Sequence, residues 1–344
     1  MSKAASPLVS VCIPSYNHAQ YLPKTIESVL NQTYNQVELV IVDDGSTDNS
    51  LEIAQKYADL YPDKVRVYTH PDQKNHGISA TMNYVFSLSK GDFWSALGSD
   101  DMLNPDKIER QVSYLQANPQ VGFVYSYASG INSQGELLRG ERALLGRDIS
   151  HETDPIYTLL EGNCIYEMTV LARRAVVVQT GERKPHLIYN DWEFWIRLLL
   201  ETKVGFMDAA LVKYRIHERN VSISAPFSSQ LKNGFEVLRS LRNEIPSNPK
   251  LARLNQERYL TQIDKHIDKF VSYMLADPEN GDRMVRELRA QIIELRLALG
   301  ESEQLLQSLT QSRGWKLLQI LWSIRRSLTP RGSLSVQALI SFFR

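Results

Sequence analysis

Two adjacent acids, Asp100 and Asp101, directly follow an apolar run at residues 93–97 that predicts a buried strand. Two carboxylates at the end of a core strand are costly unless a cation neutralises their charge. A hard divalent ion that also holds a diphosphate is a common partner for such a pair. The alternative is a structural turn before a helix, because aspartate is favoured in turns and at helix starts.

Polar side chains follow two earlier predicted strands in the same way. The apolar run at residues 8–13 is followed by Asn17, and the run at 37–42 is followed by Asp43 and Asp44. The carboxyl ends of parallel strands share one edge of a sheet, and ligands bind at that edge. We therefore expect Asp44 to face a ligand and Asp43 to hold the local turn. A helix-capping role is the alternative for Asp44.

The elements that position these residues alternate between strand and helix patterns. Strands are predicted at 8–13, 37–42, 65–68 and 93–97, and helices at 21–30, 48–57 and 78–89. This alternation predicts an α/β fold with a mostly parallel sheet flanked by helices on both faces. Further along, the patterns indicate a helix at 105–115, a strand at 121–127, a helix at 190–201, and short strands at 204–207 and 211–216. The stretch at 130–165 is irregular and is expected to form a hairpin or mobile loops.

Composition restricts the function classes. The 344 residues include 39 Lys+Arg and 39 Asp+Glu, so the net charge is zero and no nucleic-acid partner is expected. The two cysteines, Cys12 and Cys164, form neither a disulfide framework nor a zinc motif, which is typical of a reducing compartment. Since no uninterrupted apolar run is long enough to span a bilayer, we expect a cytoplasmic protein.

Five motifs occur together in the order and spacing of a known family. They lie at residues 9–48, 75–83, 98–101, 191–198 and 214–217. In these segments the chain resembles glycosyltransferase family 2, whose members have the GT-A fold, a Rossmann-like sheet, and use nucleotide sugars. Each motif alone is weak, whereas all five in register are strong evidence.

The resemblance implies a donor pocket at the ends of the first strands. Pro14 and Tyr16 would contact the nucleotide base, with Tyr16 stacked on it. Asp44 would accept the imide N–H of a uracil or thymine ring. Gly77 permits close approach of the backbone, and Asn83 would support the same pocket.

For the acid pair, the resemblance implies a division of roles. Asp100 would bind the ribose and a metal-bound water, and Asp101 would ligate Mn²⁺ or Mg²⁺ directly. His217 is the expected second protein ligand, the alternative being an ordinary surface or core histidine. The ion would offset charge on the departing diphosphate.

Asp191 is the expected general base, which takes the proton of the acceptor hydroxyl. The family usually reads Glu-Asp at this point, whereas this chain has Asn190 before Asp191, so Glu193 remains a second candidate. A helix-capping aspartate is the structural alternative. Trp192 and Glu193 are expected to contact the acceptor, and Trp195 either stacks on it or lies in the core.

Three regions are predicted: a GT-A catalytic domain at 1–224, a helical extension at 225–312 and a tail at 313–344. Apolar residues recur at coiled-coil spacing near the end of the extension, which predicts self-association through 284–309. The basic and aromatic segment 313–328 suits an amphipathic helix on the cytoplasmic membrane face. Packing of that helix on the catalytic domain or on a partner is the alternative.

Together these features predict an inverting glycosyltransferase of polysaccharide biosynthesis. The acceptor hydroxyl, on a glycan linked to lipid or protein, would displace the nucleoside diphosphate in line, and UDP-sugars are the expected donors. Two other classes stay open. A nucleotidyltransferase has a similar sheet, but residues 14–17 stand where its glycine-rich loop would be. A non-catalytic scaffold would be compatible with Asn190.

Overall fold

The structure is a computed structural model that describes residues 6–140, 143–218, 220, 233–234, 236–238 and 240–241. The chain divides into two compact units, residues 1–224 and 225–344. The described residues of the second unit are helical. The predicted segments at 284–309 and 313–328, and the predicted boundary between 225–312 and 313–344, lie outside the described residues.

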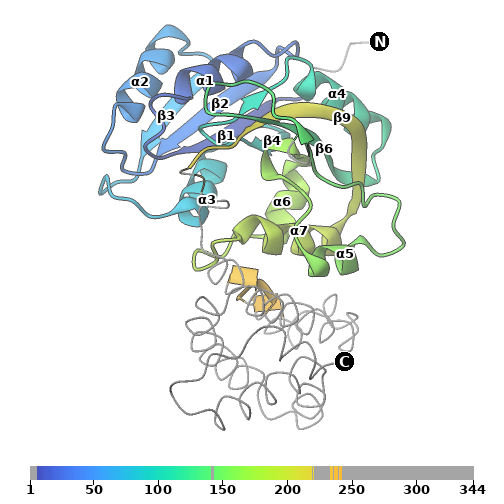
Figure 1. Cartoon of the computed structure of the whole chain (residues 1–344). Coiled ribbons are helices and arrows are strands. Elements are labelled where there is room, and N and C mark those ends of the chain that lie inside the picture. Colours follow the sequence, from blue (N-terminus) through green and yellow to red (C-terminus); the bar gives the residue numbers. More distant parts are fainter. Residues whose placement is uncertain are drawn as a thin grey trace, which may run out of the picture. The chain divides into compact units, whose positions relative to one another are not determined.

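The first unit is an α/β domain (Figure 1). Its strands are β1 (Val9–Ser15), β2 (Val37–Asp43), β3 (Val65–Thr69), β4 (Phe93–Ala96), β5 (Met102–Leu103), β6 (Val121–Ile131), β7 (Leu144–Leu145), β8 (Leu171–Arg173) and β9 (Lys203–Arg215). Its α-helices are α1 (Leu22–Leu30), α2 (Ser50–Leu60), α3 (Ile78–Leu88), α4 (Lys107–Ala117), α5 (Pro155–Glu161), α6 (Arg174–Thr180) and α7 (Asn190–Glu201). A 3-10 turn, η2 (Glu167–Thr169), precedes β8.

The strands described form one sheet in the order β3-β2-β1-β4-β8-β6-β9-β5, with β7 paired to β6. The first four strands in this order are parallel to one another, as the alternation of strands and helices predicted for this part of the sheet. The short strand β8 then runs antiparallel to both β4 and β6. Strand β9 pairs in parallel with β6, and its end pairs with β5 just after the acid pair.

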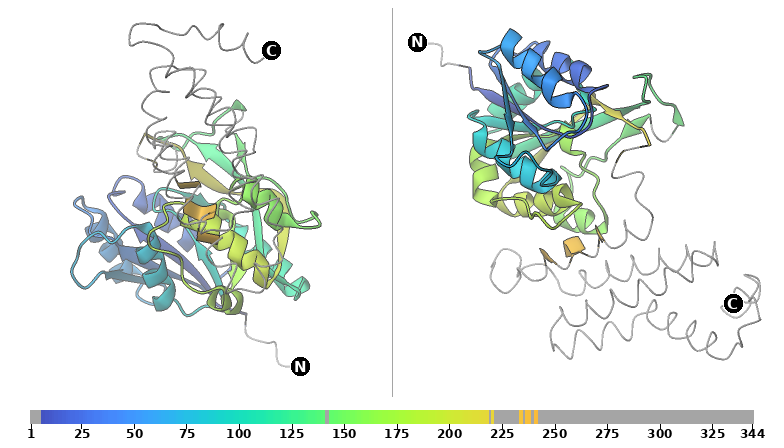
Figure 2. Two further views of the ribbon diagram at one scale, coloured as in Figure 1. Left: turned by 90° about the horizontal axis from the view of Figure 1, so that it is seen from below. Right: turned by 90° about the vertical axis from the view of Figure 1, so that its left-hand side faces the viewer.

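Helices cover both faces of the sheet. Helices α1, α2 and α4 lie on one side, and α3, α6 and α7 lie on the other (Figures 1 and 2). Alternation along β1 explains this arrangement, because Val11 and Ile13 belong to the apolar core that includes Ile26 of α1. Cys12 points the other way, toward the carbonyl of Val85 in α3, and is buried as the apolar strand pattern predicted.

The second half of this unit departs from the sequence-based expectation. The two short strands predicted at 204–207 and 211–216 are one strand, β9, because β6 continues to Ile131 and supplies a long partner. In the stretch at 130–165, the antiparallel pairing of β7 with β6 confirms the expected hairpin, whereas α5 was not predicted. None of the helices described is long and apolar enough to cross a membrane.

A lysine lies in the core between α4 and the sheet. Lys107 has no exposed surface, and its Nζ donates a hydrogen bond to Ser95 Oγ at 2.9 Å. The carbonyl of Val170 lies 3.4 Å from the same nitrogen. Burial lowers the pKa of Lys107 to about 7, because no carboxylate compensates for the lost hydration of the ammonium group.

Candidate active site

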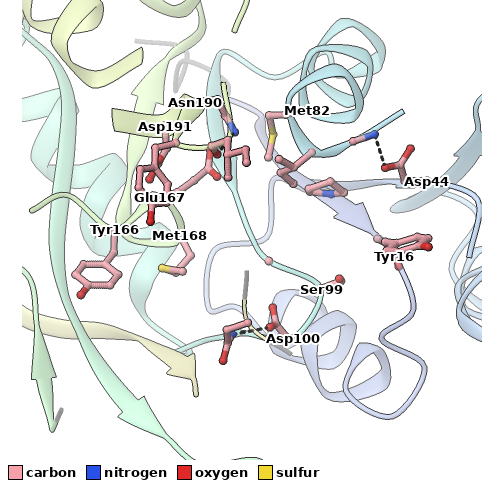
Figure 3. Close-up of a pocket in the computed structure, with 18 of the residues that line it drawn as sticks. Tyr16, Asp44, Met82, Ser99, Asp100, Tyr166, Glu167, Met168, Asn190 and Asp191 are labelled. Atoms are coloured by element: carbon pink, nitrogen blue, oxygen red, sulfur yellow. Dashed lines mark hydrogen bonds between the residues drawn. The ribbon is translucent and has the colours of Figure 1, made fainter. Parts of the chain in front are cut away.

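A cleft of about 850 Å³ opens at the carboxyl ends of β1, β2 and β4. Its volume is suited to a ligand of small-molecule size. Tyr16 and Asp44 lie on one side, Glu167 and Asp191 on the opposite side, and Asp100 between them (Figure 3). The strand ends that the sequence singled out therefore do meet, and they face a wall built from residues 163–168 and 188–192.

The loop after β1 is held in one conformation by Asn17. This residue has a positive φ of 51°, and its Oδ1 accepts hydrogen bonds from the backbone N–H groups of Thr47 at 2.7 Å and Asp48 at 3.3 Å. Asparagine tolerates the left-handed region better than most residues. Its neighbours Tyr16 and His18 consequently line the cleft from a fixed backbone, together with Pro14 of β1. Tyr16 is 44% exposed, which leaves its ring accessible to a flat ligand.

Asp43 and Asp44 have different roles. Asp43 holds the local turn, as predicted from the sequence. Asp43 accepts hydrogen bonds from the backbone N–H and the hydroxyl of Ser46, at 2.9 and 2.6 Å, and so holds the turn. Asp44 lines the cleft, and its two carboxylate oxygens accept the N–H groups of His76 at 2.7 Å and Gly77 at 3.0 Å. Gly77 has a φ of +84°, which favours glycine at the start of α3.

The acid pair differs from the sequence-based assignment. Asp101, expected to bind metal directly, is 1% exposed and does not line the cleft. Its Oδ1 accepts the backbone N–H of Arg215 at 2.8 Å, and burial together with Asp100 raises its pKa well above the ordinary value. Asp100 lines the cleft instead, and its Oδ2 lies 2.9 Å from His217 Nε2. Pairing of β5 with β9 buries Asp101. Asp100 is therefore the acid of the pair that is placed to contact an ion in the cleft.

A third residue, His18, lies beside His217 and Asp100, and it was not among the site residues predicted from the sequence. His18, Asp100 and His217 form a group whose ligand atoms all lie within 4.8 Å of one another. A carboxylate and imidazoles are donors that divalent transition metals accept, so these side chains fit such an ion. His18 lies within the motif segment at residues 9–48, but only the fold shows that it meets a residue some two hundred positions away.

Asp191 lies in the first turn of α7 and lines the cleft. Its Oδ2 accepts a hydrogen bond from Asn163 Nδ2 at 2.8 Å, and its Oδ1 accepts the N–H of Trp192 at 2.8 Å. Burial raises the pKa of Asp191 above its ordinary value. A carboxylate that is fixed, half-buried and has an elevated pKa is suited to accept a proton.

Two further residues near Asp191 gave no sequence motif. Glu167 lines the cleft from η2 and forms an ion pair with Arg183, which is 3% exposed. Burial raises the pKa of Glu167, and the nearby carboxylate of Asp191 raises it further. The Arg183 guanidinium also donates to Asn190 Oδ1 at 2.6 Å and lies over the Phe194 ring. Asn190, where the family usually has glutamate, is therefore a partner of a buried arginine.

Two residues expected at the site have other roles in the structure. Glu193 has no exposed surface and pairs with Arg197 at 2.7 Å and Lys184 at 3.1 Å, so it contacts no acceptor. Asn83 exchanges two hydrogen bonds with the backbone of Arg183 and does not line the cleft.

The two tryptophans of α7 are also largely buried. Trp192 touches the cleft but is only 5% exposed, and its indole N–H donates to the carbonyl of Leu159. Little of its ring can therefore stack on an acceptor. Trp195 is a core residue that stacks on Phe123, which was one of the two positions expected for it.

The sequence matches known glycosyltransferases. The family model "Glycosyl transferase family 2" matches residues 10–177. An uncharacterized glycosyltransferase of Haemophilus influenzae is 31% identical over 219 residues, which covers 64% of this chain and 82% of the relative. Chondroitin synthase of Escherichia coli is 38% identical over 259 residues, which covers 74% of this chain but only 34% of that enzyme. The chain thus spans about a third of the length of some curated relatives.

Solved structures share the fold. A fragment of S. aureus TarS in complex with UDP-GlcNAc has a TM-score of 0.60 and 21% identity, with 82% of this chain and 79% of that chain covered. The mannosyltransferase PcManGT from Pyrobaculum calidifontis in complex with GDP-Man and Mn²⁺ has a TM-score of 0.53 and 14% identity, with 93% and 88% covered. The curled, mostly parallel sheet is the GT-A fold that these structures share. The chain belongs to glycosyl transferase family 2.

Proposed function

We propose that the protein transfers a sugar from a UDP-sugar to a hydroxyl of a glycan, with inversion at the anomeric carbon. The observation that carries this proposal is the placement of Asp191 in one cleft with Tyr16, Asp44 and Asp100. Chondroitin synthase by its name, and TarS by its complex with UDP-GlcNAc, support a nucleotide-sugar donor and a glycan product.

The donor is proposed to lie along the ends of β1, β2 and β4. Tyr16 would stack on the base, and the Asp44 carboxylate would accept its imide N–H beside Gly77. Asp100 and His217 would hold a divalent ion near the diphosphate, as the Mn²⁺ in the related PcManGT complex supports. When bound, such an ion neutralises charge on the leaving group.

Asp191 is proposed to act as the general base. The acceptor oxygen attacks the anomeric carbon and forms the new glycosidic bond, while the bond from that carbon to the diphosphate oxygen breaks. The nucleoside diphosphate leaves with the bonding electron pair, and the hydroxyl proton passes to Asp191. The hydrogen bonds from Asn163 and from the Trp192 backbone hold the carboxylate for this step.

The test is Asp191→Asn, which keeps the shape of the side chain but removes its basicity. We expect donor affinity to stay within error of wild type and transfer to fall about 10²–10⁴-fold, the usual contribution of a positioned base. Asp208→Asn is the matched control, because Asp208 is an exposed acid on β9. Isothermal titration with UDP and product analysis with UDP-sugars and oligosaccharide acceptors provide the two readouts.

Undiminished transfer by Asp191→Asn would contradict the base assignment. Absence of transfer and of UDP binding in the wild-type protein would favour a scaffold. Release of pyrophosphate from a nucleoside triphosphate and a sugar phosphate would instead show a nucleotidyltransferase.

A further inference from the structure

Three segments of the chain bring donor atoms together at one end of the cleft. His18 comes from the loop after β1, Asp100 follows β4, and His217 follows β9. One ligand atom from each lies within 4.8 Å of the other two. The rings of His18 and His217 meet edge to face, with 5.7 Å between centroids. The proposed ion at Asp100 and His217 would therefore have a second imidazole beside it.

The structure fixes the orientation of His18 from two sides. Its Nδ1 lies 2.7 Å from Ser99 Oγ, and Ser99 is the neighbour of Asp100. Its backbone N–H donates to Ser50 Oγ at 3.0 Å, and Ser50 is held by Asp48. Histidines that bind metals typically engage a partner through the other ring nitrogen, which sets the tautomer and the ring direction. The Ser99 contact on Nδ1 makes Nε2 the nitrogen that would bind an ion.

The separation between Asp100 and His217 suits a shared ion, whereas the His18 ligand atom lies within 4.8 Å of both and would approach them to share it. Bonds of about 2.1 Å place adjacent ligand atoms about 3 Å apart and opposite ones about 4 Å apart. The Nε2–Oδ2 pair of His217 and Asp100 is already at 2.9 Å. We propose that His18 is a third protein ligand, so that the ion site is a centre of two histidines and one carboxylate. This inference rests on the proposed function, which places a divalent ion at Asp100 and His217.

Two imidazoles change which ions the site prefers. Mg²⁺ favours oxygen ligands and gives up its water reluctantly, whereas imidazole suits transition metals. The second histidine therefore shifts the preference of the site from Mg²⁺ toward Mn²⁺ and Co²⁺. His18 is in this respect a specificity-determining residue for the ion, and it also ties the loop that carries Tyr16 to the ion site.

The experiment compares the full-length wild-type protein with His18→Gln and with the matched control His151→Gln, whose side chain is 91% exposed. Titration calorimetry with MnCl₂, CoCl₂ and MgCl₂, each with and without UDP, gives the affinities. Pulsed electron paramagnetic resonance of bound Mn²⁺ counts the coupled imidazole nitrogens. Circular dichroism and thermal unfolding without ligand confirm that each variant is folded.

We expect two coupled imidazoles in the wild type and in His151→Gln, and one in His18→Gln. Mn²⁺ and Co²⁺ should bind at least about 10-fold more weakly to His18→Gln, the scale of losses seen when support of a metal site is removed, while Mg²⁺ affinity should change less. A single imidazole in the wild type would overturn the inference without need of any variant, and would leave the proposed ion at Asp100 and His217 intact. Failure of the wild type to bind Mn²⁺ while it binds UDP would overturn both the inference and the metal part of the proposed function.

Discussion

At the scale of single residues, Lys107 predicts an unusual pH dependence of stability. Its pKa is about 7 in the folded protein and about 10.4 in the unfolded chain. Between these values the unfolded state binds a proton that the folded state does not, so the free energy of unfolding rises with pH from about 7 to about 10. Below pH 7 Lys107 is protonated in both the folded and the unfolded state, and its buried charge destabilises the folded protein to the full extent.

Lys107→Met should remove this dependence. We expect the free energy of unfolding at pH 7 to increase by an amount on the order of 3 kcal/mol, since one pKa unit corresponds to about 1.4 kcal/mol and a hydrogen bond is lost in return. Ser95 Oγ donates to the carbonyl of Val170 at 2.7 Å, so it should keep a partner in the variant. Urea unfolding at pH 7 and pH 9 measures the effect. If the free energies of unfolding of wild type and variant differed as much at pH 9 as at pH 7, the lowered pKa of Lys107 would be contradicted.

The residue types at the site were predictable from the sequence, but their individual roles were not. Asp100 and Asp101 are adjacent, and which of them faces the cleft depends on a backbone N–H of Arg215, more than a hundred residues away. His18 and His217 meet although some two hundred residues separate them in the sequence. Glu193 did carry a local signal, because Arg197 stands four residues later at the spacing of a helical ion pair.

At the scale of elements, the loop between β1 and α1 determines the shape of the donor side. Asn17→Ala removes the hydrogen bonds that Oδ1 accepts. The alanine β-carbon still causes strain at a φ of 51°, and no side-chain hydrogen bond offsets that strain. Asn17→Gly removes the same bonds but relieves that strain. We expect the alanine variant to be the less stable by about 1 kcal/mol. Both variants should bind UDP more weakly, because Tyr16 and His18 lose their fixed backbone.

Urea unfolding and UDP titration of the two variants provide the measurements. Asn118→Ala is a suitable control, because Asn118 also ends an element, α4, but lies outside the cleft lining. Equal stability of the alanine and glycine variants would show that the positive φ is not retained in solution.

The elements that the sequence predicted well are those with long apolar periodicity, namely the strands and helices up to residue 117 other than β5, and the helix α7. Short elements were missed, because β8, η2 and α6 depend on neighbours brought in by the fold. Arg173 illustrates this dependence. The Arg173 guanidinium donates to the carbonyls of Leu115 at 2.6 Å and Val121 at 2.9 Å. These contacts close the end of α4 against β6.

At the scale of the whole molecule, ligand binding should raise thermal stability in a way that reports on the ion. A ligand at one hundred times its dissociation constant adds about 2.7 kcal/mol to the free energy of unfolding. For a domain of this size, that amounts to an increase in Tm of roughly 5–10 °C. UDP with Mn²⁺ should therefore raise the Tm more than UDP alone, and a chelator should reverse the extra increase.

Asp100→Asn provides the comparison for this prediction, because it removes the acid that lines the cleft while Asp101 stays in place. The variant should keep the increase in Tm that UDP alone gives and lose the part that depends on Mn²⁺. An equal Mn²⁺ effect in Asp100→Asn and wild type would place the ion elsewhere.

Strand β9 connects the two ends of the cleft through one uninterrupted stretch of backbone. It begins at Lys203, just after the helix that carries Asp191, and ends at Arg215, two residues before His217. One inserted residue in a strand turns all later side chains to the opposite face. Around Gly140, by contrast, nothing lies within 4 Å of an added β-carbon. Natural length variation among homologues should therefore accumulate near residue 140 and be scarce between 203 and 217, where a single extra codon would separate proton acceptor from ion.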